Sequence, residues 1–155
     1  MPPDPDGAGT AAATASSARP DQGPDDAATV ARTAAALVAA FGRHDTAAYF
    51  QHFAPEATFV FYTVDHVLTS RAAYQSLWST WEQQDGFRVR SCSSSNVAVT
   101  VLGDIAVVTH DVSTTVSGRG GTTDLSERES IVFQRQGTRW LAVHEHLSPR
   151  SVLPP

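Results

Sequence analysis

The chain has 155 residues, 41% of them hydrophobic, which suits one globular domain with a sizeable core. Its net charge of −5 and pI of about 5.6 argue against a nucleic-acid-binding surface, which needs clustered basic residues. All eleven basic residues are arginines, so lysine Schiff-base chemistry and a lysine-containing phosphate loop are excluded.

The single cysteine, Cys92, precludes an internal disulfide and is typical of a reducing cytoplasm. No apolar run is long enough to span a membrane, and the N-terminus lacks the layout of a secretory signal. We therefore expect a cytoplasmic protein with neither a membrane nor a nucleic acid as partner.

Residues 1–26 contain five of the nine prolines and almost no bulky apolar side chains. Such a segment buries too little surface to offset the entropy of ordering, which predicts a disordered N-terminal arm. A single domain is expected over residues 27–155, with Asp25 and Asp26 near the start of its first helix.

Three helices and one strand are predicted next. Residues 27–45 carry apolar side chains at helical spacing, and 46–54 form a second, short helix. Residues 56–64 are rich in β-branched and aromatic side chains and predict a strand. The third helix spans 70–84 and ends at Gly86.

The remainder of the chain predicts strands separated by the turn signals Gly-Asp, SGRGGTTD and Gln-Gly-Thr, at 87–95, 96–102, 104–116, 125–135 and 139–148. Helices followed by a meander of long antiparallel strands indicate an α+β domain. A long, bent sheet can cup the helices and leave a conical pocket between them.

This order of elements resembles the nuclear transport factor 2-like (NTF2-like) superfamily, which includes SnoaL-like polyketide cyclases, ketosteroid isomerases and the association (hub) domain of calcium/calmodulin-dependent kinase II. The segments HDTAAYFQHFAPEATF, SLW, GDIAVV and RWLAVHEHLS carry the resemblance, and the last of these, with the SVLPP ending, is most similar to the hub domain. The resemblance covers about residues 27–155. It implies a cone-shaped fold, with three N-terminal helices packed on a strongly bent antiparallel sheet that encloses a pocket.

The departures from these relatives are informative. Three catalytic positions of the ketosteroid isomerases fall here at Phe61, Leu37 and Ile131. The arginines that line the hub pocket fall at Val112, Ile131 and Leu147. The hub's pocket-edge tryptophan is retained as Trp78. The resemblance therefore implies a pocket more apolar than in either relative, without the steroid-isomerising residues.

The strand 139–148 can present either of two faces to the pocket. One face holds Trp140, Ala142, His144 and His146, and the other holds Leu141, Val143, Glu145 and Leu147. Because the resemblance places Leu147 toward the pocket, alternation puts Glu145 there and the two histidines outside. A bulge of one residue would reverse this assignment.

The same reasoning brings Glu129, Glu145 and His110 together as candidate catalytic residues. A desolvated carboxylate has a raised pKa and a nearby histidine would hold it ionised, which suits general acid–base catalysis near neutral pH. The structural alternative is that these groups only satisfy buried partners such as Arg88 or Tyr49. The candidate substrate-binding residues are Phe59, Phe61, Tyr62, Tyr74, Trp78, Val112, Ile131 and Leu147.

His144 and His146 could bind a metal, since both imidazoles point the same way, but Asp111 is the only obvious third ligand. The resemblance implies instead that this pair serves the outer face of the sheet. We predict no metal site and no cofactor.

Two functions remain open. The first is a cofactor-free enzyme, a cyclase, isomerase or dehydratase acting on a polyketide-like or other hydrophobic secondary metabolite. The second is a ligand-binding or hub-like assembly module without catalysis. Either reading predicts a homo-oligomer, with a homodimer as the simplest form.

Overall fold

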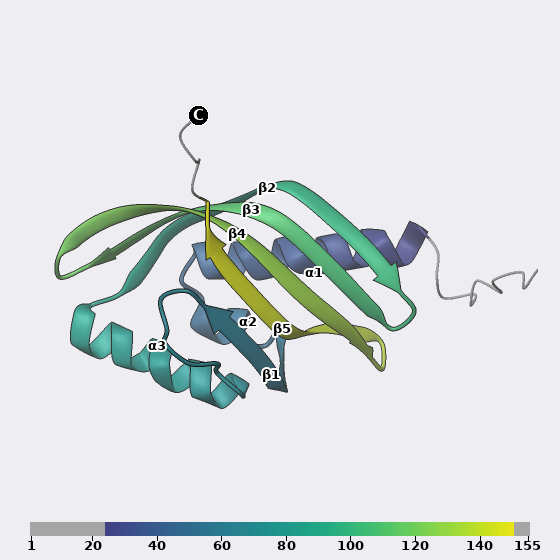
Figure 1. Cartoon of the computed structure of the whole chain (residues 1–155), viewed down its shortest axis with the longest axis horizontal. Helices are drawn as coiled ribbons and strands as arrows, with labels where there is room; N and C mark the ends of the chain where they lie inside the picture. Colours follow the sequence, from purple (N-terminus) through teal and green to yellow (C-terminus); the bar gives the residue numbers. More distant parts are fainter. Residues whose placement is uncertain (1–23, 151–155) are drawn as a thin grey trace, which may run out of the picture.

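The computed structural model describes residues 24–150 as helices packed on one curled sheet (Figure 1). In chain order the elements are α1 (Pro24–Gly42), α2 (Thr46–Phe50), β1 (Phe53–Phe61), α3 (Arg71–Asp85), β2 (Arg88–Leu102), β3 (Ile105–Gly118), β4 (Gly121–Gln136) and β5 (Arg139–Pro149). Most of the predicted arm and the SVLPP ending lie outside the described residues. None of the helices in the described part is long and apolar enough to cross a membrane.

The five strands lie in the order β1-β5-β4-β3-β2. Strands β2 to β5 form an antiparallel meander, and β1 joins its far edge parallel to β5. Figure 1 shows the long strands arching over α1, with α3 packed beside β1. The predicted α+β class and bent sheet are confirmed.

The helix ends follow local chemistry. Ser70 begins α3 by accepting a hydrogen bond from the Ala73 N–H at 3.0 Å, and Gly86 ends it with φ of 63°, a conformation that favours glycine. The first helix begins at Pro24, three residues before the start of the predicted helix. Proline suits a first helical position because its missing N–H has no partner there.

Two predicted boundaries were wrong because tertiary pairing overrides local pattern. The helix predicted over 46–54 ends at Phe50, since Phe53 already pairs with Ala142 of β5. The strands predicted at 87–95 and 96–102 are one strand, β2, with a bulge between Ser95 and Ala98. A bulge keeps a strand continuous while it bends.

A second bulge decides which side chains of β5 face the helices. Ala142 pairs with Phe133 and His144 pairs with Val132. Val143 therefore has no partner on β4 and is the extra residue of a bulge. Side chains before and after this point therefore alternate out of phase.

The predicted outward position of Trp140 and Ala142 was wrong, because both are buried in the core, while Leu141 and Val143 are only half-buried. The predicted inward position of Glu145 is confirmed, with an exposed fraction of 3%.

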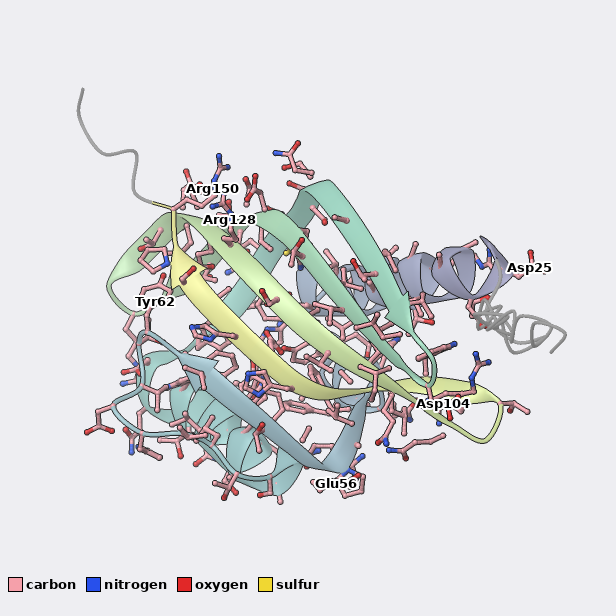
Figure 2. The ribbon with its side chains drawn as sticks, turned by 45° about the vertical axis from the view of Figure 1, so that its right-hand side comes forward. Asp25, Glu56, Tyr62, Asp104, Arg128 and Arg150 are labelled. Atoms are coloured by element: carbon pink, nitrogen blue, oxygen red, sulfur yellow. The ribbon has the colours of Figure 1, made fainter. Side chains whose placement is uncertain are left out.

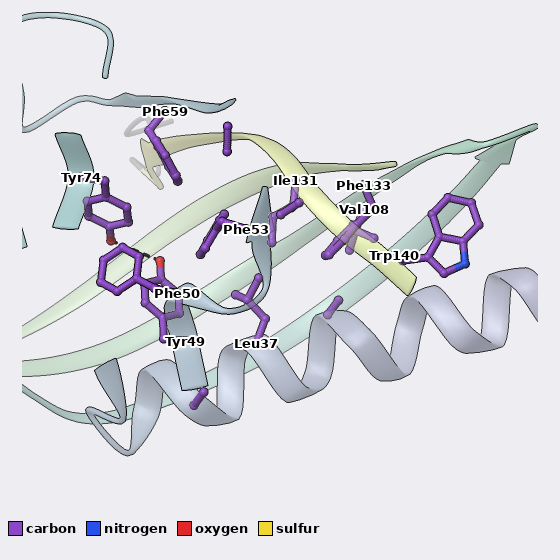
Figure 3. Close-up of a cluster of buried hydrophobic side chains, with 14 of the residues drawn as sticks. Leu37, Tyr49, Phe50, Phe53, Phe59, Tyr74, Val108, Ile131, Phe133 and Trp140 are labelled. Carbon is purple, nitrogen blue, oxygen red and sulfur yellow. Dashed lines mark hydrogen bonds between the residues drawn. The ribbon is translucent and has the colours of Figure 1, made fainter. Parts of the chain in front are cut away.

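The core is dominated by aromatic rings from α2, β1 and α3 (Figure 3). Tyr74 lies with its ring centroid 4.7 Å from that of Phe59 and 5.0 Å from that of Phe50. Phe133, Val108 and Ile131 continue this core along the sheet. The contact between Phe59 and Tyr74 holds α3 against β1.

Gly118, at the end of β3, lies close to the C-terminal end of α3. A Cβ at this position would lie 2.9 Å from the Asp85 carbonyl oxygen, whereas a Cβ at Gly120 would meet nothing within 4 Å. We expect Gly118→Ala to lower the free energy of unfolding by about 1–3 kcal/mol through overpacking. Gly120→Ala is the matched control and should change it by less than about 0.5 kcal/mol. Urea unfolding of the three proteins measures both values, and equal stabilities would contradict this contact.

Candidate active site

A cavity of about 610 Å³ lies between the concave face of the sheet and helices α1 and α3. Its wall is largely aromatic and aliphatic, and three glutamates interrupt it. Six of the predicted substrate-binding residues line it: Phe61, Tyr62, Tyr74, Trp78, Val112 and Leu147. Its size and mainly apolar wall are typical of a small-molecule site.

Two predicted wall residues lie elsewhere. Phe59 and Ile131 are fully buried in the core and do not line the cavity. Both side chains belong to the buried hydrophobic cluster (Figure 3).

The glutamates come from adjacent strands. Glu127 and Glu129 of β4 are two residues apart and so share the concave face, and Glu145 of β5 reaches that face because of the Val143 bulge. All three are buried and line the cavity. Sequence reasoning missed Glu127, although its separation of two residues from Glu129 on one strand was a sufficient signal.

Glu145 is the most buried of the three carboxyl groups. Burial, followed by the negative charge of Glu129, raises the pKa of Glu145 well above the usual range of a glutamate. Its Oε2 atom has no hydrogen-bond partner among the described residues. Burial therefore favours the neutral acid form of Glu145, and its side chain lines the cavity with one buried oxygen unpartnered among the described residues.

Glu129 is held by His110 of β3. The Nε2 atom of His110 lies 2.8 Å from Glu129 Oε1, and its Nδ1 atom lies 2.5 Å from the hydroxyl oxygen of Ser94. Since a carboxylate only accepts, Nε2–H donates to Glu129, and Ser94 can donate to Nδ1 of the neutral ring. His110 does not line the cavity and acts on it only through Glu129.

Tyrosine hydroxyls complete the polar part of the wall. The Tyr49 and Tyr74 hydroxyl oxygens are 3.1 Å apart, the pair joined by the dashed line in Figure 3. Burial, followed by the charge of Glu145, raises the pKa of both tyrosines well above 10. Tyr62 donates to Glu127 Oε2 at 2.6 Å, and burial raises the pKa of Tyr62 to about 12. All three phenols remain protonated donors.

The single cysteine also lies at the cavity. Cys92 lines the cavity, but burial raises the pKa of its thiol to about 11, so it is not a thiolate at neutral pH.

The two histidines of β5 lie away from the cavity. His144 Nδ1 is 2.7 Å from the Thr58 hydroxyl oxygen, and burial with the neighbouring His146 lowers the pKa of His144. Asp111, the suggested third ligand, instead pairs with Arg128 at 3.0 Å and with Arg150 at 3.6 Å; Figure 2 shows these two arginines together beside the end of β5. Within residues 24–150, no three His, Cys, Asp or Glu side chains are grouped to hold a metal ion.

The SnoaL-like domain family matches residues 30–151 of this chain. No curated protein matches it. An NTF2-like protein from Cytophaga hutchinsonii is similar in structure, with a TM-score of 0.69 and 13% identity over 83% of this chain and 99% of that one. The CaMKII hub of S. rosetta has a TM-score of 0.66 and 20% identity, covering 83% of this chain and 98% of the hub.

A provisionally named dehydratase of the NTF2-like family from Streptomyces avermitilis has a TM-score of 0.66 and 21% identity, covering 84% of this chain and 100% of that one. At these identities the structural neighbours show the fold alone. The family match covers most of the chain, and the cone-shaped architecture agrees with it. The protein is therefore a member of the SnoaL-like family within the NTF2-like fold.

Proposed function

We propose that this protein is an enzyme that moves protons on a hydrophobic small molecule, using Glu145 as the general acid and Glu129 as the general base. The observation that carries the proposal is the buried carboxyl group of Glu145, which lines an apolar cavity with one oxygen unpartnered beside a second carboxylate. Two carboxyl groups with different environments in one site are a recurring basis for acid–base catalysis.

The two glutamates have different roles in this proposal. Glu145 is the better donor, because burial favours its neutral form, and it protonates a carbonyl or a departing hydroxyl oxygen of the substrate. Glu129 accepts a proton from substrate carbon, with its carboxylate oriented by the hydrogen bond from His110. The Tyr49 and Tyr74 hydroxyls stabilise negative charge that develops on oxygen.

Cyclisation, isomerisation and dehydration all consist of such paired proton transfers, and none of them needs a cofactor. The aromatic wall favours an unsaturated or polycyclic substrate, such as a polyketide-like secondary metabolite. The name of the S. avermitilis neighbour is compatible with the dehydration variant of this proposal.

The experiment uses 5-nitro-1,2-benzisoxazole, a compact aromatic probe. A base removes its C3 proton, the N–O bond breaks, and the coloured phenolate that forms is measured directly. We expect Glu129→Gln to lower kcat/KM about 100-fold or more, and Glu145→Gln about 10-fold, because a phenolate leaves with little help from an acid.

Glu56→Gln is the control, since Glu56 is exposed on β1 and Figure 2 shows it at the far end of that strand from Tyr62. A rate no higher than that of acetate at equal concentration, or one unchanged by all three substitutions, would contradict the proposal.

Assembly is the second candidate function, favoured by the hub domains among the structural neighbours. A homodimer or larger ring would use the outer face of the sheet, where His146 is exposed. Trp140, which alternation predicts on the same outer face, cannot contribute because it is buried within the protomer. Native mass spectrometry tests this candidate: a defined oligomer that His146→Glu dissociates supports it, and a monomer at micromolar concentration contradicts it.

A further inference from the structure

Arg119 lies at the tip of the hairpin between β3 and β4 and lines the outer part of the cavity, together with Trp81 and Phe87. It is the one basic side chain among the described residues that line this cavity. A cation there is unexpected in an acidic protein whose cavity also holds three glutamates.

The position of Arg119 is fixed from three directions. Its backbone N–H donates to the Asp85 carbonyl oxygen at 2.7 Å, and its guanidinium Nη2 donates to the Gln83 carbonyl oxygen at 3.3 Å. Its aliphatic stem lies against Gly86, where a Cβ would be 3.6 Å from Arg119 Cγ, an ordinary van der Waals distance. The C-terminal end of α3 therefore holds the guanidinium at the cavity mouth.

The charge of Arg119 is not neutralised within the described part of the chain. No carboxylate in residues 24–150 forms an ion pair with it, although Asp85 also lines the cavity. A guanidinium has five N–H donors, and only one long hydrogen bond to protein is formed here. The remaining donors can receive a carboxylate, sulfonate or phosphate group.

The glutamates set the direction in which such a ligand must enter. Glu127 lies six positions after Gly121 along β4, so Arg119 at the hairpin tip and the three glutamates line different parts of the cavity. An anionic group is repelled by the glutamates and attracted by Arg119, which leaves one favourable orientation. The apolar part then contacts the aromatic wall.

We propose that Arg119 binds the anionic group of an otherwise hydrophobic substrate at the cavity mouth and so directs its reactive part toward Glu129 and Glu145. This inference rests on the proposed function only in requiring that the cavity bind a hydrophobic small molecule. It narrows the substrate class to amphiphilic anions.

Two dyes with the same aromatic framework test the inference. N-phenyl-1-naphthylamine is neutral, and 1-anilinonaphthalene-8-sulfonate adds one sulfonate; the fluorescence of both increases in an apolar site. We expect Arg119→Gln to raise the Kd of the sulfonate about 5- to 10-fold and to leave the Kd of the neutral dye within about 2-fold. Arg119→Lys, which keeps the charge but loses the forked N–H donors, should raise the Kd of the sulfonate less than Arg119→Gln does.

Arg139→Gln is a matched control, because Arg139 is also exposed and its Nη2 likewise donates to a backbone carbonyl, that of Gln51, at 3.3 Å. It should change neither Kd. Equal weakening of both dyes, or no change in either, would show that Arg119 only fastens the hairpin to α3 and would overturn the inference.

The outcomes also separate this inference from the proposed function. If the neutral dye binds and Arg119→Gln has no selective effect, the inference alone fails. If neither dye binds, the cavity is not a ligand site, and both proposals fail.

Discussion

Glu145→Gln should make the protein progressively more stable than the wild type as the pH rises from about 4.5 to 8. The pKa of Glu145 is raised in the folded state, mainly by burial, whereas in the unfolded chain it is close to 4.3. Between these two values the folded wild type holds a proton that the unfolded chain has released. Its stability therefore falls with pH, by up to about 1.4 kcal/mol per pH unit.

The sign of this effect is opposite to that of an ordinary paired carboxylate. The favourable contribution of neutral Glu145 is fully present below the unfolded pKa and is lost as the pH rises through the folded pKa. Glutamine has nearly the same shape and does not titrate, so the variant lacks this slope. Because Oε2 has no hydrogen-bond partner among the described residues, the substitution breaks no hydrogen bond at that oxygen.

Urea unfolding of both proteins at pH 4, 5.5, 7 and 8 measures the difference. Glu127 titrates with the same sign, because burial also raises its pKa, but it is present in both proteins and cancels. Glu56→Gln, at an exposed position, should run parallel to the wild type. Parallel curves for Glu145→Gln would mean that Glu145 is not a neutral acid in the folded protein.

Phe59→Ala should lower the free energy of unfolding by about 3–5 kcal/mol. Phe59 is 0% exposed, and its ring centroid lies 5.1 Å from that of Phe53, 5.7 Å from that of Phe61 and 4.7 Å from that of Tyr74. Truncation removes these contacts and leaves a closed void in the core. The surrounding side chains of β1 and α3 are too closely packed to fill it completely.

Phe61→Ala is the matched comparison, two residues along the same strand. Phe61 lines the existing cavity, so its removal enlarges a space that is already present and should cost less stability, about 1–3 kcal/mol. It should weaken binding of N-phenyl-1-naphthylamine more than Phe59→Ala does. Denaturant unfolding and dye titration of both variants check this, and the reverse order would place the cavity wall at Phe59.

Much of the fold could be predicted from the sequence, because its signals are local. The apolar spacing of α1, the Ser70 and Gly86 ends of α3 and the turn residues between long strands all depend on neighbours a few positions away. The order of these elements then leaves few topologies, since helices that precede a meander must cover one of its faces.

The candidate site could be predicted only in part. Alternation brought Glu129 and His110 to one face of the sheet, and the structure confirms that they are in contact at 2.8 Å. Alternation also predicts the correct face for Glu145. It predicts the wrong face for the start of the same strand, because Trp140 and Ala142 point inward as well. Whether Glu129 and Glu145 catalyse a reaction stays a prediction.

The sequence by itself determined the α+β class, the antiparallel meander and the presence of two carboxyl groups on its inner face. Only the tertiary structure decided the bulge at Val143, because an extra residue is defined by the partner strand and leaves no mark on its own strand. It also decided that Phe59 and Ile131 fill the core, that Glu127 joins the cavity, and that Arg119 is held against α3. Each of these depends on packing between segments far apart in the chain, which local spacing does not encode.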